Sequence, residues 1–149
     1  MRSLRHAEIP AEAVVSEGGK GRRGYDVIHT VGPIAHGSVG ETERQALQDC
    51  YFNCLHTATK NQLRTVAFPC ISTGVYGYPP EEAVKVALNT VRKYLKDNPA
   101  QLDRVIFCVF LKSDEDLYNS HLPAYFPKAG DKEFNKVQPW SHKDCKSPS

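Results

Sequence analysis

Residues 66–83 read VAFPCISTGVYGYPPEEA, and this stretch joins an apolar strand to a helix through a loop of small residues. The strand is expected at residues 65–68, because the apolar run ends at Pro69. The helix is expected to begin near Pro80, since proline suits the first helical turn and the carboxylates of Glu81 and Glu82 complement the positive end of the helix dipole. A strand, a loop and a helix in this order form the repeating unit of an α/β fold.

The same alternation continues on both sides of this stretch. Residues 25–31 (YDVIHTV) predict a buried strand, and the continuously apolar residues 105–111 (VIFCVFL) predict a strand covered on both faces. Helices are expected at residues 41–60, from residue 80 to the Asn98-Pro99 stop, and at residues 114–125. The first two helices have buried stripes, which comprise Leu47, Cys50, Tyr51, Cys54, Leu55 and Ala58, and Val84, Ala87, Leu88, Val91 and Leu95. This order predicts a three-layer α/β/α fold with a mixed, mostly parallel sheet.

Composition limits the class of protein. The chain has 149 residues, 40% hydrophobic and 24% charged, which is typical of one globular domain. No apolar run approaches the roughly 18–20 residues of a membrane-spanning helix, and residues 1–10 lack the apolar stretch of a secretory signal. We therefore expect no membrane partner and a cytoplasmic or nuclear location, with a mitochondrial location left open.

The net charge of +2 is unevenly distributed. Residues 1–24 and residues 128–149 each contain five Lys and Arg against three Asp and Glu, so residues 25–127 carry a net charge of −2. Nucleic acid is therefore not expected as a partner, because a duplex-binding domain has a clustered basic face. We interpret residues 1–24 as a divergent N-terminal segment in which residues 12–16 fit a strand. Residues 128–149 are expected to form a disordered polar tail, with docking of Trp140 left open.

Five cysteines in an odd, scattered pattern indicate reduced thiols rather than a disulfide framework. Cys50, Cys54 and His56 have a spacing found in metal sites, but Cys50 and Cys54 are four residues apart on an apolar helical face. Core packing is therefore favoured, and no metal is expected. Cys70 and His29 could form a nucleophile and its base, but nothing in the sequence orients either residue.

The loop at residues 70–79 is the strongest local indication of a ligand site. Ser72-Thr73-Gly74 and Gly77 are small enough for successive backbone N–H groups to point at an anion, and the following helix adds a positive dipole end. A plain tight connection is the alternative. Tyr76 and Tyr78 could close over a ligand. Phe110, at the end of the third strand, fits either stacking on a base or ribose or core packing.

Four blocks together resemble a macrodomain of the MacroD type: VIHTVGP (27–33), the opening stretch (66–83), VIFCVF (105–110) and LPAYFP (122–127). The resemblance covers residues 12–127 and marks residues 25–127 as a partial macrodomain. It implies binding of ADP-ribose or O-acetyl-ADP-ribose, and partners that are mono-ADP-ribosylated proteins. It also implies hydrolase activity that removes ADP-ribose from acidic residues or deacetylates O-acetyl-ADP-ribose, without a cofactor.

The resemblance also assigns residue roles. It places the diphosphate on the loop formed by Ile71, Ser72, Thr73, Gly74, Val75, Tyr76 and Gly77, and it places Phe110 beside the distal ribose or adenosine. The hydrolytic water would lie near the Gly74 backbone, in substrate-assisted chemistry, so no catalytic side chain is assigned. The signature at residues 29–33 is expected to be chiefly structural.

The sequence departs from the family at its start. Family members begin with further strands, one with an adenine-recognising aspartate, followed by an Asn-Ala-Ala-Asn segment and a glycine-rich loop, and this chain contains none of these. We therefore expect a fold that lacks its first strands and leaves strand edges unpaired, which invites pairing with another chain. The alternatives to an enzyme are a non-catalytic ADP-ribose reader and an inactive truncated isoform.

Overall fold

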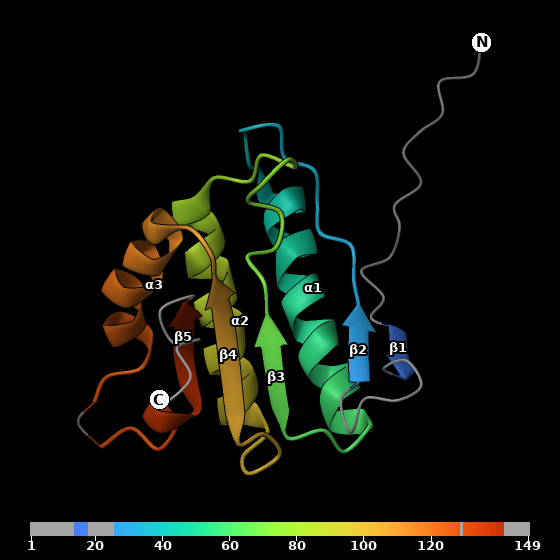
Figure 1. The fold of residues 1–149 in the computed structure, drawn as a ribbon, viewed down its shortest axis with the longest axis vertical. Coiled ribbons are helices and arrows are strands. Elements are labelled where there is room, and N and C mark those ends of the chain that lie inside the picture. The colour runs from blue at the N-terminus through green and yellow to red at the C-terminus, as the bar shows by residue number, and fades with distance from the viewer. Residues whose placement is uncertain (1–13, 18–25, 129, 142–149) are drawn as a thin grey trace, which may run out of the picture.

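The computed structural model describes residues 14–17, 26–128 and 130–141, which form strands, helices and short loops (Figure 1). The elements in chain order are β1 (Val14–Glu17), β2 (Asp26–His29), α1 (Glu41–Lys60), β3 (Thr65–Phe68), α2 (Pro80–Asp97), β4 (Arg104–Val109), α3 (Lys112–Tyr125), a 3-10 helix (Phe134–Lys136) and β5 (Val137–Ser141). The strand at residues 14–17 overlaps the expected one, and residues 12–13 lie outside the described part.

The described strands form two separate sheets. β1 pairs with β2 in an antiparallel ladder, while β3, β4 and β5 form a parallel sheet in that spatial order. The registers pair Phe68 with Phe107 and Phe107 with Pro139. β2 and β3 share no ladder, although both contact α1, and they point the same way in Figure 1.

The helices form where the sequence predicts them. α1 spans the predicted residues 41–60, and α2 begins at Pro80, with proline in its first turn and two acidic side chains there. Every residue of both predicted stripes is buried. The N–H of Gly40 donates to Oε2 of Glu43 at 2.9 Å and so satisfies one of the groups left open at the start of α1. α2 packs between α1 and α3.

The core lies between the helices and one face of the parallel sheet. Burial alternates along β3 and β4, so Val66, Phe68, Val105, Phe107 and Val109 are buried and the residues between them are more exposed. Aromatic rings connect the layers, and their centroids are 5.0 Å apart for Tyr51 and Phe68, 6.0 Å for Phe68 and Phe107, and 4.8 Å for Phe107 and Tyr118.

The opposite face of β4 differs from the expectation of a strand covered on both faces. Ile106 and Cys108, between the buried residues of β4, are only half-buried. Within the described residues the helices cover one face of this sheet, and a continuously apolar sequence cannot reveal whether its second face has a cover. The described part thus contains two of the three expected layers.

The segment after residue 128 also differs from the expected disordered tail, as far as it is described. Val137 is buried, Phe134 packs against the core, and β5 extends the sheet beside β4 (Figure 1). Trp140 pairs with Cys108 in the ladder and is 38% exposed. Two apolar side chains thus anchor a polar segment, and Pro139 is compatible with an edge strand because an edge leaves N–H positions unused. Residues 142–149 lie outside the described part.

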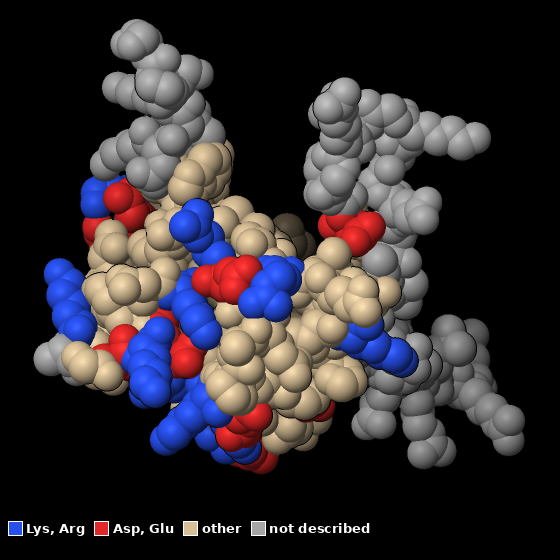
Figure 2. Space-filling model, turned by 90° about the horizontal axis from the view of Figure 1, so that it is seen from below, with Lys and Arg blue, Asp and Glu red and all other residues tan. Residues whose placement is uncertain are grey.

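Charged side chains of both signs are interspersed at the end of the molecule seen in Figure 2. At the amino ends of β3 and β4, Nε of Arg64 donates to Oδ2 of Asp103 at 2.7 Å, and Nη2 of Arg64 donates to Oδ1 at 2.8 Å.

Among the described helices, none is long and apolar enough to cross a membrane.

Candidate ligand loop at the carboxyl end of the sheet

The candidate site lies where β2, β3 and β4 end. In a parallel α/β sheet the carboxyl ends of the strands meet at one edge, and ligands bind there. α1, α2 and α3 each begin at this edge, at the top of Figure 1, so their positive dipole ends are gathered around the loop at residues 69–79. The chain order alone therefore brings this loop to the edge of the sheet that favours anions.

The loop presents a row of unused backbone donors. Among the described residues, the N–H groups of residues 72–76 donate to no acceptor within the protein. The loop is closed by two bonds at its ends: the N–H of Gly77 donates to the carbonyl of Gly74 at 3.0 Å, and that of Tyr78 to the carbonyl of Ser72 at 2.9 Å. Five successive open donors on a closed loop can surround an anion such as a diphosphate.

Two residues of the loop have left-handed backbone conformations. Ser72 has a φ of +65° and Gly77 a φ of +68°. A Cβ on Gly77 would also lie 3.0 Å from the backbone nitrogen of Gly37, so glycine is required there by both conformation and space. Ser72 has no such freedom, and it therefore stores backbone strain in the middle of the candidate site.

A second segment, residues 35–38, holds the loop in place. The N–H groups of Ala35 and His36 donate to the carbonyl of Tyr76 at 2.8 and 3.1 Å, and the N–H of Gly37 donates to the carbonyl of Gly77 at 2.8 Å. Residues 35–38 are not among the residues that the sequence predicts for the site. The sequence feature that marks this segment is Gly37, because the chain turns at His36 and Gly37 with φ angles of +50° and +82°.

The end of β2 packs directly under the loop. A Cβ on Gly32 would lie 2.1 Å from Oγ of Ser72 and 2.6 Å from Cγ2 of Ile71. The 29–33 signature is therefore structural in the way the resemblance implies: its glycine permits the close approach of the two segments. Oγ of Ser72 is buried and has no hydrogen-bond partner in the described residues.

The side chains around the open amides are exposed and mostly apolar. Val75 is fully exposed, and Phe110, which follows β4, is 85% exposed. Since β4 lies beside β3, the ring of Phe110 stands at the same sheet edge as the loop. Because its side chain is exposed, Phe110 does not belong to the core, and the alternative of core packing is excluded for this residue.

The two tyrosines of the loop differ in exposure. Tyr76 is 37% exposed, whereas Tyr78 is 1% exposed. The expectation that Tyr78 closes over a ligand is therefore wrong, because its ring is part of the core.

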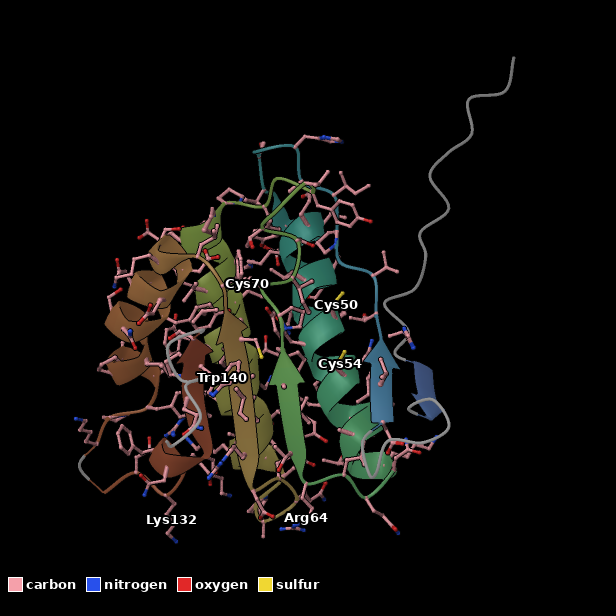
Figure 3. The ribbon with its side chains drawn as sticks, in the orientation of Figure 1. Cys50, Cys54, Arg64, Cys70, Lys132 and Trp140 are labelled. Atoms are coloured by element: carbon pink, nitrogen blue, oxygen red, sulfur yellow. The ribbon has the colours of Figure 1, made fainter. Side chains whose placement is uncertain are left out.

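The surroundings of the four described cysteines disfavour the thiolate form that a nucleophile requires. Burial raises the pKa of Cys70 to about 12, and the nearby Asp114 and Cys108 act in the same direction. Burial likewise raises the pKa of Cys50, and that of Cys54 to about 11. Figure 3 shows Cys50 and Cys54 one turn apart on the same side of α1, where both are buried in the core as predicted. Within the described residues, no three His, Cys, Asp or Glu side chains are close enough to hold a metal ion.

Comparison with known proteins identifies the family. The Macro domain model matches residues 1–87, and the chain belongs to this family. It is 56% identical over 104 residues to the ADP-ribose glycohydrolase MACROD2 of Xenopus laevis, an alignment that covers 70% of this chain and 25% of that protein. The chain thus spans about a quarter of this relative's length, and it spans 40% of the rat ADP-ribose glycohydrolase MACROD1.

Solved structures confirm the macrodomain fold. The macro domain of ganglioside induced differentiation associated protein 2 superposes with a TM-score of 0.72 at 32% identity, covering 80% of this chain and 59% of that one. The Trypanosoma brucei macrodomain in complex with ADP-ribose superposes with a TM-score of 0.59 at 38% identity, covering 64% and 38% of the two chains.

Proposed function

We propose that residues 25–127 bind ADP-ribose, with its diphosphate on the open amides of residues 72–76 and its distal ribose or adenosine beside Phe110. The observation that supports this most directly is the row of five N–H donors that have no acceptor in the described part of the chain. A relative in this fold has been solved with ADP-ribose bound, and the similar MACROD1 and MACROD2 are named ADP-ribose glycohydrolases.

The electrostatics of the site favour backbone recognition over recognition by charged side chains. The first turn of α2 has two carboxylates, and Nζ of Lys85 lies 3.1 Å from Oε1 of Glu82 and 3.9 Å from Oε1 of Glu81. This lysine therefore already neutralises acidic neighbours. Backbone N–H groups and helix dipoles provide positive potential without a long cationic side chain that must be ordered on binding.

The reaction proposed for this site is removal of ADP-ribose from mono-ADP-ribosylated acidic residues, together with deacetylation of O-acetyl-ADP-ribose. The loop offers hydroxyls and amides but no carboxylate, imidazole or thiolate among residues 71–77. A water near the Gly74 backbone, oriented by the bound diphosphate, is the nucleophile that this arrangement can hold. The reduced-thiol pattern fits action in the cytoplasm or nucleus.

Gly74 provides the sharpest test of binding. A Cβ on Gly74 would meet no atom within 4 Å, so its substitution is tolerated sterically. In Gly74→Glu, a carboxylate among the open amides would repel the diphosphate, and we expect at least about tenfold weaker binding of ADP-ribose by calorimetry. Gly74→Ala is the matched control and should bind within a few-fold of wild type. Equal affinities for the two variants, or no heat from wild type at millimolar ADP-ribose, would refute the proposal.

Hydrolysis is tested separately with an automodified mono-ADP-ribosylated protein. Release of labelled ADP-ribose by wild type and its loss in Gly74→Glu would support the enzyme. Binding without release over hours would instead establish the non-catalytic reader, which is the second candidate. The composition of the loop is the observation that keeps the reader in consideration, because residues 71–77 contain no carboxylate, imidazole or thiolate.

A further inference from the structure

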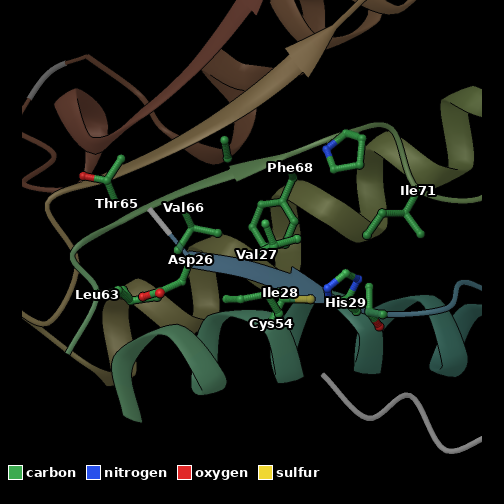
Figure 4. A pocket seen from close by; sticks show the side chains of 13 residues that line it. Asp26, Val27, Ile28, His29, Cys54, Leu63, Thr65, Val66, Phe68 and Ile71 are labelled. Carbon is green, nitrogen blue, oxygen red and sulfur yellow. The ribbon is translucent and has the colours of Figure 1, made fainter. Parts of the chain in front are cut away.

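Two cavities in the described part of the chain differ in their lining. The larger, of about 550 Å³, lies between β2 and β3, and core side chains such as Val66, Phe68 and Ile71 line it (Figure 4). The other, of about 430 Å³, lies where α1 and α2 end. Every residue that lines this second cavity has a polar side-chain group, and we call it the polar cavity. Its lining comprises His56, Thr59, Lys60, Tyr94, Asn98 and Gln101.

The polar cavity lies at the end of the molecule opposite to the ligand loop. α1 and α2 begin at the edge of the sheet where the loop lies, and they end beside this cavity (Figure 1). Residues 80–94 of α2 alone correspond to roughly 20 Å of helix. None of residues 71–77 lines the cavity, so a ligand bound here would leave the loop unoccupied.

The polar cavity offers hydrogen-bond donors and a positive charge. Within the described residues, neither the ammonium group of Lys60 nor the side-chain amide of Gln101 has an ion-pair or hydrogen-bond partner, and both groups donate hydrogen bonds. The imidazole of His56 adds a further donor. Among the described residues no carboxylate lines the cavity, and Asp97, in the last turn of α2, is exposed outside it. An anionic group with several acceptor oxygens matches this set.

The negative ends of two helix dipoles oppose an anion here, but their effect is limited. The carbonyl of Tyr94 already accepts from the N–H and from Nδ2 of Asn98, at 2.9 and 3.0 Å. The carbonyl of Thr57 accepts from the N–H and from Nδ2 of Asn61, at 3.1 and 2.8 Å. These bonds occupy carbonyls at the helix ends, whereas Lys60 has a full charge that can contact the ligand directly. The charge-assisted bond therefore outweighs the partial charges of the helix ends.

A hydrogen-bonded pair of hydroxyls joins the two helices in the cavity and leaves acceptors open. Oη of Tyr94 lies 2.6 Å from Oγ1 of Thr59, and the hydroxyl of Thr59 donates to the carbonyl of His56 at 3.0 Å. Tyr94 is therefore the donor within the pair, because the proton of Thr59 is in use. The remaining lone pairs of the two hydroxyls, together with Oδ1 of Asn98, accept hydrogen bonds from hydroxyl groups of a ligand.

An exposed aromatic pair borders the cavity on α1. Phe52 is 46% exposed, and its ring stacks on that of His56 with an interplanar angle of 6° and centroids 6.0 Å apart. Phe52 and Lys60 are about two helical turns apart, or roughly 12 Å along the axis. The gap between ring and ammonium group is shorter, because helical side chains point towards the N-terminus and Lys60 therefore leans towards Phe52. A single small ligand can contact both.

We propose that the polar cavity binds a nucleoside monophosphate. The contacts, from phosphate through sugar to base, are Lys60 and Gln101, then the Thr59–Tyr94 pair and Asn98, then the Phe52–His56 pair. A cavity of about 430 Å³ is in the size range of small-molecule sites. A bare phosphate would leave the acceptors and the exposed ring unused, and an uncharged nucleoside would leave the ammonium group unused. The proposal does not depend on ADP-ribose binding at the loop.

The test measures binding of adenosine 5′-monophosphate to the full chain by NMR, in the Gly74→Glu background that weakens binding at the loop. The backbone amide resonances of residues 56–60 and 94–101 should shift with increasing ligand, while those of residues 71–77 should not. Adenosine lacks the phosphate and ribose 5-phosphate lacks the base. Each should bind at least about fivefold more weakly than the nucleotide, because each loses one class of contact.

Lys60→Gln is the variant for the phosphate contact, with Lys132→Gln as its matched control. Both lysines are exposed and neither has a described ion pair, but Lys132 lies outside the cavity. Lys60→Gln should weaken binding of the nucleotide at least about tenfold and leave adenosine binding unchanged, and Lys132→Gln should change neither. Phe52→Leu keeps an apolar side chain without a ring, so it should weaken binding of the nucleotide but not of ribose 5-phosphate.

Four results would each overturn the proposal. The first is the absence of shifts in residues 56–60 and 94–101 at millimolar nucleotide, including the case in which shifts are confined to residues 71–77. The second is equal binding of the nucleotide and of adenosine or inorganic phosphate. The third and fourth are unchanged nucleotide binding in Lys60→Gln and in Phe52→Leu. Binding of ADP-ribose at the loop is measured separately with Gly74 intact, so failure of either proposal leaves the other standing.

Discussion

Gly32 and Ser72 are in such close contact that a single added carbon would make them overlap. The Cβ position of Gly32 lies 2.1 Å from Oγ of Ser72, although 40 positions separate the two residues in the chain. The end of β2 thus forms the support on which the ligand loop rests. The shape of that loop, and with it the direction of its open amides, depends on a residue outside the loop.

Gly32→Ala tests this support. The added methyl group must displace Ser72 or Ile71, and overpacking of this kind costs about 1–3 kcal/mol. We expect a lower free energy of unfolding in urea and weaker binding of ADP-ribose. Gly74→Ala is the control for stability, since its Cβ meets no atom of the protein within 4 Å. Wild-type stability and affinity in Gly32→Ala would show that the loop moves freely and that the support is unimportant.

Ser72 itself should be replaceable with a gain in stability. Its φ of +65° is unfavourable for a residue with a Cβ, and its buried hydroxyl has no described partner. Ser72→Ala removes only the buried hydroxyl. Ser72→Gly also relieves the backbone strain of the positive φ. The flexibility of glycine in the unfolded chain opposes this gain by about 0.5–1 kcal/mol. We expect both variants to unfold at higher urea than wild type, as monitored by circular dichroism. A loss of stability in both would show that the hydroxyl has a partner in solution.

The sequence predicted those features of the site that depend on local chemistry. The loop at residues 71–77 was recognisable because small residues follow an apolar strand and precede a proline that begins a helix. The stripes of α1 and α2 were recognisable because helical spacing places apolar residues on one side. Both are properties of consecutive residues, and the structure places them where they were expected.

The features that were missed depend on contacts between distant segments. The bonds from Ala35 and Gly37 to the loop cross about forty residues, and nothing in residues 34–40 indicates their acceptors. Tyr78 looks like a ligand-closing aromatic in the sequence, yet the path of the chain turns it into the core. β5 was missed because a polar segment forms a strand here through two apolar anchors and an available edge.

The link between α2 and the segment before β5 should make the docking of β5 depend on pH. Nη1 of Arg92 lies 2.5 Å from Oδ2 of Asp131, and the N–H of Glu133 donates to Oδ1 at 2.9 Å. These bonds favour the carboxylate, so the pKa of Asp131 in the folded protein is below its usual value of 3.8. The stabilisation is therefore complete above the unfolded pKa, near pH 4, and is lost as the pH falls through the lower folded pKa.

Trp140, the single tryptophan of the chain, reports this docking by its fluorescence. We expect its emission to shift towards that of a solvated tryptophan in Asp131→Asn at pH 7, and in wild type at acid pH. Asp103→Asn is the control, because Asp103 also pairs with an arginine but with a side chain 60% exposed, against 6% for Asp131. An identical response of the two variants would contradict a specific role for Asp131.

The four described cysteines should resist alkylation in the folded protein. Burial raises the pKa of each thiol, to about 11 for Cys54 and to about 12 for Cys70, so at pH 8 the reactive thiolate is scarce. Relative to a free cysteine with a pKa near 8.5, a pKa of 12 lowers the thiolate fraction of Cys70 roughly a thousandfold. The experiment is best done in Cys145→Ser, because Cys145 lies outside the described residues.

In this background, a disulfide reagent should titrate four thiols in denaturant and almost none over the same time in buffer. Fast native reaction of the half-buried Cys70 would contradict its raised pKa and would reopen the question of a thiolate at the end of β3. The same samples test the chemistry of the site. If water held at the loop is the nucleophile, release of ADP-ribose must continue after prolonged exposure of the folded protein to iodoacetamide, since no thiolate takes part. Loss of release in step with modification of Cys70 would have two explanations: the sulfur takes part in the reaction, or its adduct displaces the loop. Cys70→Ser separates them, because serine supplies no thiolate and adds no bulk. Release by Cys70→Ser would indicate a displaced loop, and loss of release would indicate the sulfur.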